Sequence, residues 1–224
     1  PYCQRLHLAN HLAESFQRRA ARHAEYFAER LPASQHWRLF RDFQDCCAFL
    51  DVETTGLDDF AEITTAALYD GRTLRYYVNG RNLRQLAHDL RNYRLVITYN
   101  GKCFDGPMIE RNLAVQLPKA HIDLRYVLRS LGLTGGLKMC ERQLGLDRPG
   151  SMQDIDGRLA VKLWYDYRRR GNDKALQTLL AYNIQDTLNL HVLMVYAYNA
   201  KLRQTPFFSY YSLPPCRLPA NPFR

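Results

Sequence analysis

FLDVETTGL, residues 49–57, is the stretch from which the fold can be predicted first. It completes an apolar run that begins at Cys46 and ends in a polar, glycine-containing segment, the pattern of a buried strand followed by a loop. Asp51 and Glu53 stand two residues apart at the end of this strand, so both side chains point to the same face. Two carboxylates side by side at the edge of an apolar sheet need a positive partner, which is either a nearby Arg or Lys or a hard divalent cation.

The rest of the chain continues this strand into an α/β pattern. Asp70-Gly71 suits the positive backbone angles of a hairpin turn, so the residues around it are expected to form two further strands. Strands are predicted within residues 46–53, 61–80 and 94–101 and at the start of 121–131, and helices within 82–93, 104–115, the rest of 121–131, 137–146, 157–171 and 173–202. The order β-β-β-α-β-α-β-α predicts a mixed central sheet flanked by helices, whose ligands bind near the carboxyl ends of strands.

The 224 residues are enough for one sizeable core and short for two independent domains. We expect a basic helical extension over residues 1–44, formed by a helix at 4–31 that docks by one face, and a single domain over 45–200. Residues 205–224 hold five of the ten prolines, so 201–224 are expected to form a Pro-rich C-terminal tail, extended or docked on the domain.

Composition narrows the class of protein. The net charge of +9, from 31 Lys and Arg against 22 Asp and Glu, favours a polyanionic partner, although many basic proteins bind none. The six cysteines show no C-x-x-C pair, which argues against a zinc site and for a reducing compartment. Without an apolar run of about 18 residues, a soluble, cytoplasmic protein with no membrane contact is expected.

Two further acidic clusters follow strands or lie on an apolar helix. Asp105 comes just after the turn-forming Asn100-Gly101, in the first turn of a predicted helix, where it is either a site residue or a partner of the helix N-terminus. Asp186 lies in a strongly apolar helical segment, and Tyr182, four residues earlier, shares its face. Tyr182 taken alone is more readily explained as a packed aromatic than as a catalytic phenol.

Taken together, FLDVETTGL, TYNGKCFD and YNIQD resemble, in this order, the three motifs of the DEDD exonuclease superfamily, which has a ribonuclease H-like fold with a five-stranded mixed sheet. The chain is most similar to the YprB-type ribonuclease H-like branch. The matching segments span roughly residues 46–197 and are FLDVETTGL, ITYNGKCFDGPMIERN, ERQLGLDR, DIDGRLAVKLWYDY and LLAYNIQDTLNLHVLM. One subgroup has a histidine five positions before the last Asp, where this chain has Ala181. The other has a tyrosine four positions before it, so the resemblance is to the Tyr subtype.

The resemblance implies a two-metal-ion 3′–5′ exonuclease that hydrolyses the phosphodiester bonds of DNA or RNA, with a single-stranded 3′ end as the expected partner. Its catalytic residues would be Asp51, Glu53, Asp105, Tyr182 and Asp186, and the four acids among them would bind two Mg²⁺ or Mn²⁺ ions. Nucleic-acid contacts are expected at Thr54, Leu57, Asn100, Lys102 and Phe104, with a core position equally open for Phe104. The alternatives are a structure-specific endonuclease, an inactive nucleic-acid-binding module, and a basic protein-interaction domain with structural acids.

Overall fold

The computed structural model describes residues 2–146 and 156–223, with side chains from Leu8 onward, so the end of the ERQLGLDR segment and the start of DIDGRLAVKLWYDY lie outside the described residues. A five-stranded sheet has the order β3-β2-β1-β4-β5. Its strands are β1 (Cys47–Thr54), β2 (Ile63–Tyr69), β3 (Leu74–Val78), β4 (Leu95–Thr98) and β5 (His121–Asp123). The pairs β1–β2 and β2–β3 are antiparallel and the pairs β1–β4 and β4–β5 are parallel. The predicted mixed sheet with flanking helices is confirmed.

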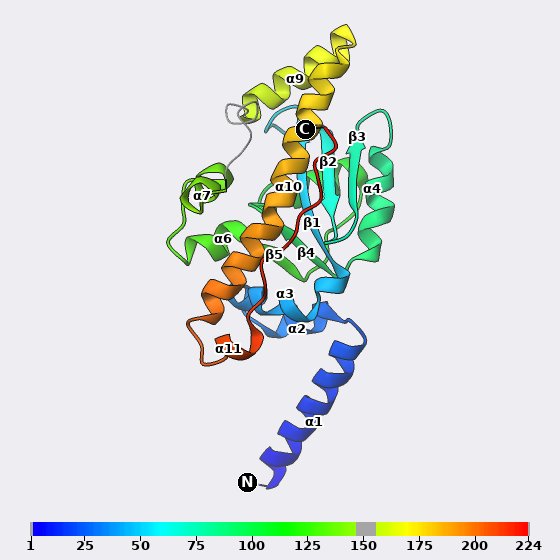
Figure 1. The fold of residues 1–224 in the computed structure, drawn as a ribbon. Helices are drawn as coiled ribbons and strands as arrows, with labels where there is room; N and C mark the ends of the chain where they lie inside the picture. The colour runs from blue at the N-terminus through cyan, green and yellow to red at the C-terminus, as the bar shows by residue number, and fades with distance from the viewer. Residues whose placement is uncertain (1, 147–155, 224) are drawn as a thin grey trace.

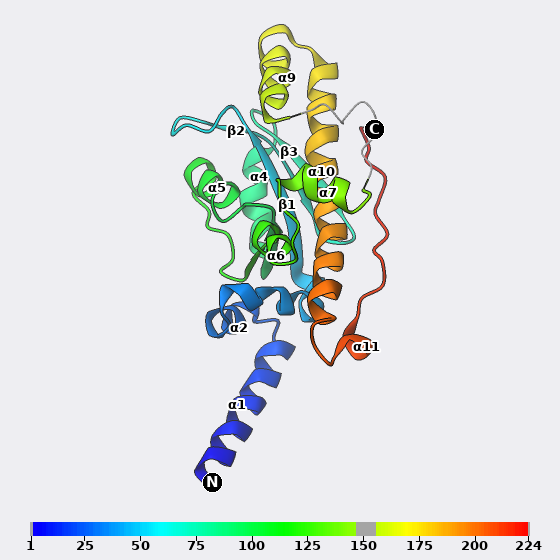
Figure 2. The same cartoon turned by 90° about the vertical axis from the view of Figure 1, so that its left-hand side faces the viewer.

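Helices cover both faces of the sheet (Figures 1 and 2). The α-helices are α1 (Tyr2–Ala20), α2 (Ala24–Arg30), α3 (Leu39–Asp42), α4 (Leu83–Asp89), α5 (Asp105–Leu113), α6 (Leu124–Arg129), α7 (Leu137–Gln143), α9 (Gly157–Arg170), α10 (Asp173–Leu202) and α11 (Phe208–Tyr211). Short 3₁₀ helices occur at η1 (Ala33–Arg38), η2 (Gln44–Cys46) and η3 (Leu90–Asn92). Among the described residues, no helix combines the length and apolarity needed to cross a membrane.

Alternate side chains of β1 point to opposite faces of the sheet and pack against different helices. Leu50 and Val52 pack in an apolar cluster with side chains of α4 and α5, whereas Phe49 packs in a second cluster with α10. Side chains two apart on a strand share a face, so Asp51 and Glu53 continue the face of Phe49. These two acids are therefore directed toward α10, the 30-residue helix that lies across the sheet.

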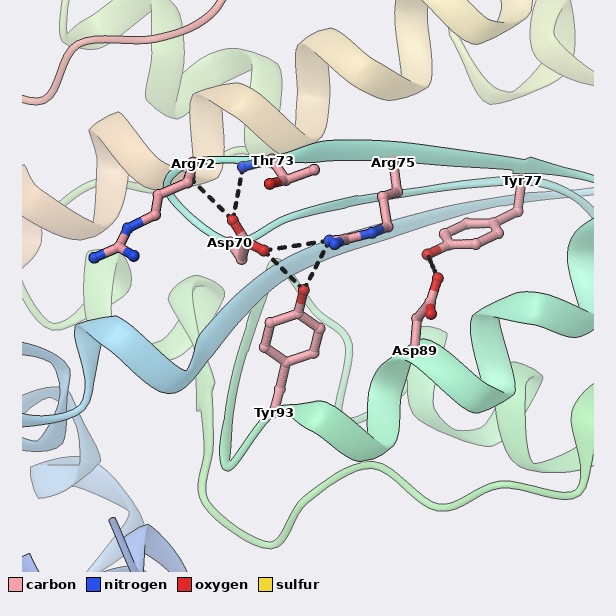
Figure 3. A network of polar contacts seen from close by, with 7 residues as sticks. All are labelled: Asp70, Arg72, Thr73, Arg75, Tyr77, Asp89 and Tyr93. Atoms are coloured by element: carbon pink, nitrogen blue, oxygen red, sulfur yellow. Dashed lines mark hydrogen bonds and ion pairs between the residues drawn. The ribbon is translucent and has the colours of Figure 1, made fainter.

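The β2–β3 hairpin is held by the carboxylate of Asp70 (Figure 3). Its Oδ1 accepts the backbone N–H groups of Arg72 and Thr73, at 3.0 and 2.7 Å. Its Oδ2 accepts from the Arg75 guanidinium at 3.2 Å and from the Tyr93 hydroxyl at 3.0 Å. Tyr93 is the residue that follows η3. The Asp70 carboxylate therefore holds the hairpin turn and also ties it to the segment after η3. The hairpin turn predicted at Asp70-Gly71 is confirmed.

The prediction of one helix over residues 4–31 is wrong. The chain breaks between α1 and α2 at Arg22, which has a φ of 55°. The Arg22 guanidinium donates to the carbonyl of Asp42 at 2.9 Å and lies 2.5 Å from the Asp45 carboxylate, and these contacts hold the turn. The cluster that contains Phe49 and apolar side chains of α10, here called the α10-side core, also includes buried side chains of residues 24–43, namely Ala24, Ala28, Trp37, Leu39, Phe40 and Phe43. By contrast, α1 projects from the body, with Leu12 and Phe16 51% and 66% exposed, so it does not dock by one face.

Residues 203–223 form α11 and then an extended segment that returns along α10 (Figure 1). Leu213 and Leu218 pack against the α10-side core. Asn221 reaches the first third of α10, where its side-chain amide donates to the carbonyl of Ala181 at 2.7 Å. The division of the chain into an extension, a domain and a tail stays a prediction.

Candidate active site

Three carboxylates meet where β1 passes α10. Oxygens of Asp51, Glu53 and Asp186 all lie within 4.8 Å of one another, and we call these residues the acid trio. Asp51 and Glu53 come from the α10-facing side of β1, and Asp186 projects from the middle of α10. Residues 135 positions apart in the sequence are thus joined because the long apolar helix packs across the first strand.

Asn183 fixes the orientation of Asp51. Its side-chain amide donates to Asp51 twice, to the backbone carbonyl at 3.1 Å and to Oδ2 at 2.7 Å. Asn183 is fully buried and precedes Asp186 by three residues, so both lie on the same face of α10. The YNIQD segment contains Asn183, but nothing in its spacing alone shows that it faces β1.

Asp105 is held by a backbone N–H of β1, just beyond the residues of β1 that pair with β4. Pairing between β1 and β4 covers Cys47–Phe49 and so ends before Val52. The N–H of Val52 instead donates to Asp105 Oδ1 at 3.1 Å, which places this buried carboxylate beside the backbone between the first two acids. Burial raises the pKa of Asp105 to about 7, although the hydrogen bond from Val52 opposes the shift.

The donor set fits a divalent cation. Burial raises the pKa of Asp51 well above its usual range, and the charges of Asp186, Glu53 and Asp105 raise it further. A positive ion bound among these oxygens would offset both effects, since hard divalent cations take carboxylate ligands. Asp51, Glu53 and Asp186 are therefore the residues that could hold a metal ion, with Asp105 adjacent.

A groove runs beside Glu53 at the carboxyl end of β1. It has a volume of about 690 Å³ and is lined by Val52, Glu53, Thr54, Gly56, Leu57, Phe104, Asp156, Gly157, Arg158, Val161 and Lys162. Leu57, one of these lining residues, is 87% exposed. The Thr54 hydroxyl donates to the carbonyl of Gly56 at 2.6 Å and so orders the loop that carries Leu57. The structure therefore brings Thr54, Leu57 and Phe104 together next to the acids.

Asn100 and Lys102 lie elsewhere. Their backbone N–H groups donate to the buried carboxylate of Asp123, at 2.8 and 3.1 Å, and the N–H of Arg125 donates to the same carboxylate at 3.1 Å. Asn100 adopts a φ of 66°, and Lys102 lines a separate cavity of about 440 Å³ that also contains Tyr126. Asp123 thus anchors the loop that leads into Asp105, although the sequence pattern does not single it out.

Tyr182 lies one turn before Asp186 on α10 and is 6% exposed. With Ala181 it forms a small apolar cluster, against which Leu159 and Phe223 pack. The ammonium group of Lys138 on α7 lies 4.8 Å from the centre of its ring. Both the packing and the shared helical face that the sequence suggested for Tyr182 are therefore present.

The sequence itself matches an RNase H superfamily model over residues 48–198, a range that contains the acid trio, Asp105 and Tyr182. This chain belongs to the RNase H superfamily. Its mixed five-stranded sheet with helices on both faces is an RNase H-like fold. A comparison with curated proteins finds no significant match.

Among solved structures, the RNase H-like fold of this chain is similar to part of the family B DNA polymerase from the hyperthermophilic archaeon Pyrobaculum calidifontis, with a TM-score of 0.52. The alignment covers 75% of this chain and 27% of the polymerase, at 15% sequence identity. The chain thus spans about a quarter of the polymerase, and the likeness concerns the fold.

Proposed function

We propose that this RNase H-like chain is a two-metal-ion nuclease of the DEDD type, closest to the YprB-type branch, that removes nucleotides from the 3′ end of DNA or RNA. The observation that carries the proposal is the acid trio, whose oxygens lie within 4.8 Å of one another beside an open groove. Divalent ions held there would lower the pKa of the attacking water and stabilise the leaving oxygen.

The protein groups around the acids have distinct proposed roles. Asp51, Glu53 and Asp186 hold the metal ions, and Asp105 assists from its position on the Val52 N–H. Asn183 keeps Asp51 in one orientation by donating to its Oδ2. The hydroxyl of Tyr182 orients the nucleophilic water by hydrogen bonding, a role in which the phenol does not have to accept a proton.

The groove is the proposed site of the terminal nucleotide. Leu57 and Phe104 offer apolar surfaces against which a base or sugar can pack, while Arg158 and Lys162 on α9 offer positive charge to the phosphates. Lys102 remains a proposed contact to the strand outside the groove, from its exposed position beside the second cavity.

The proposal is tested by incubating 5′-labelled single-stranded DNA and RNA with the protein and Mg²⁺ or Mn²⁺. Asp51→Asn is the inactivating variant, and Asp89→Asn is a matched control because Asp89 accepts a hydrogen bond from the Tyr77 hydroxyl outside the trio. A ladder that shortens from the 3′ end, lost with chelator and in Asp51→Asn but kept in Asp89→Asn, is the expected result.

Other outcomes select the alternatives. Cleavage of a circular single strand that depends on Asp51 would replace the exonuclease with an endonuclease at the same site. Tight binding of nucleic acid without cleavage in either metal would indicate an inactive binding module. Cleavage that persists in Asp51→Asn would contradict the proposed site altogether.

A further inference from the structure

The extended segment of residues 212–223 is fastened to α10 at two separate places. Near the end of the helix, the side-chain amide of Asn199 donates to the carbonyl of Leu213 at 2.8 Å, and the N–H of Leu213 donates back to Asn199 Oδ1 at 2.8 Å. In the first third of the helix, the amide of Asn221 donates to the carbonyl of Ala181 at 2.7 Å. Three hydrogen bonds at two places therefore hold an otherwise extended chain in one path along α10.

The contact at Asn221 combines a buried amide with an aromatic contact. Asn221 is 8% exposed, and while its Nδ2 donates to α10, its Oδ1 accepts the N–H of Phe223 at 3.1 Å. The Phe223 ring meets Tyr76 of β3 edge-on, with 5.0 Å between ring centres (Figure 1 shows the segment beside β3). A buried amide that uses both its donor and its acceptor specifies one geometry, because a misplaced amide would lose both hydrogen bonds.

This fastening lies at the helical turn that carries Tyr182. Asn221 bonds the carbonyl of the residue immediately before Tyr182, and Phe223 packs against the cluster formed by Ala181 and Tyr182. The ring of Tyr182 also faces the ammonium group of Lys138 at 4.8 Å. The position of the phenol therefore depends on α10, on α7 and on a segment distant from both in the sequence.

We propose that residues 212–223 act as a strap in which Asn221 and Phe223 are positioning residues for Tyr182. The inference rests on the proposed function, in which the Tyr182 hydroxyl orients the attacking water. A displacement of about 1 Å in a group that orients a reactant can lower the rate about 100-fold. Contacts that restrict the position of the Tyr182 phenol, such as those of the strap, should therefore raise the rate. The hydrogen bonds and ring contact of Asn221 and Phe223 described above join them to α10 and β3 and not to the acid trio, and neither residue lines the groove, so metal binding and substrate affinity should not depend on them.

The test measures kcat, KM and the Mn²⁺-induced rise in Tm for Asn221→Ala and Phe223→Ala. Leu218→Ala is the matched control, since Leu218 is a partly buried residue of the same segment that packs on the α10-side core. We expect kcat to fall on the order of 10-fold in the first two variants, with KM within about two-fold and the Mn²⁺ shift retained. Phe223→Leu should recover most of kcat, and Leu218→Ala should keep it.

The decisive comparison repeats both alanine substitutions in a Tyr182→Phe background. If the strap acts through the Tyr182 hydroxyl, the added substitutions lower kcat no further. Losses that multiply in this background, or an equal loss in Leu218→Ala, would overturn the positioning role. Unchanged kcat in the strap variants of an active wild type refutes the strap alone, whereas a wild type without metal-dependent cleavage refutes the proposed function and the strap with it.

Discussion

Asp51→Asn should stabilise the metal-free protein and at the same time remove its stabilisation by divalent cations. Burial, followed by the charges of Asp186, Glu53 and Asp105, raises the pKa of Asp51 above its usual value of 3.8. Ionised Asp51 therefore opposes folding when no metal is bound. An asparagine keeps the shape of the side chain and can still accept the hydrogen bond that Asn183 donates to Oδ2.

The direction of the effect follows from linkage between protonation and folding. A folded-state pKa above the unfolded value means that the ionised Asp51 carboxylate lowers the free energy of unfolding, and the hydrogen bond from Asn183 offsets only part of that loss, so Asp51→Asn should raise the free energy of unfolding at pH 8. For a chain of this size, 1 kcal/mol corresponds to a change in Tm of about 2–4 °C. With Mn²⁺ at 100 times its Kd, the wild type should gain about 2.7 kcal/mol and Asp51→Asn much less.

The gain should also depend on pH in a defined direction. Because the folded-state pKa of Asp51 is raised, its contribution to stability is present below pH 3.8 and is lost as the pH rises through the folded-state value. The advantage of Asp51→Asn in chelator should therefore grow from pH 4 to pH 8.

The assay is thermal and urea unfolding of wild type, Asp51→Asn and Asp89→Asn, each with chelator and with Mn²⁺. Asp89→Asn should lose stability, because the Asp89 carboxylate accepts from the Tyr77 hydroxyl at 2.6 Å, and should keep the full Mn²⁺ shift. If Asp51→Asn is less stable than the wild type in chelator, or is stabilised equally by Mn²⁺, the description of the trio as a crowded metal site is refuted.

Three further predictions concern the stability of variants at residues outside the acid trio. Asp123→Ala removes the acceptor of three backbone N–H groups and should lower the free energy of urea unfolding by about 2–4 kcal/mol, with Asp123→Asn intermediate; equal stability of the two variants would contradict this. Gly101→Ala should cost at least about 2 kcal/mol in the same assay, because its Cβ would lie 2.2 Å from Thr98 Oγ1, and a neutral result would show that the loop has room to move. Burial lowers the pKa of His191 from 6.5 to about 4, so its contribution to stability is held above pH 6.5 and lost as the pH falls to 4. His191→Phe should therefore lose less Tm than the wild type over that range, and parallel pH profiles would exclude this role.

The central strand and its acids were predictable because their pattern is local. Alternation along FLDVE places Asp51 and Glu53 on one face, and the structure directs that face toward α10. The helical spacing of Tyr182 and Asp186 gave their common face in the same way. What the sequence could not give is which strand α10 crosses, because helix packing is set by the whole apolar surface rather than by any motif.

Residues whose role depends on tertiary contacts were missed for that reason. Asn183 donates a hydrogen bond to Asp51, 132 positions away, and Asp123 accepts one from the N–H of Asn100, 23 positions away. In the sequence, Asn183 looks like an ordinary polar residue within a helix, and Asp123 like one at the start of a helix. The break at Arg22 was missed as well, because a positive φ is uncommon for an arginine and the contacts to Asp42 and Asp45 that accompany it here are tertiary. The assignment of Asn100 and Lys102 as nucleic-acid contacts stays a prediction.

Anomalous diffraction from crystals grown with Mn²⁺ and a short single-stranded oligonucleotide tests the metal site most directly. We expect strong peaks among Asp51, Glu53 and Asp186, the residues whose oxygens lie within 4.8 Å of one another, with the 3′ end of the oligonucleotide in the adjoining groove. The same crystals of Asp51→Asn should lose these peaks. Ordered oligonucleotide with no Mn²⁺ at the acid trio, or Mn²⁺ bound at another place on the chain, would contradict the account.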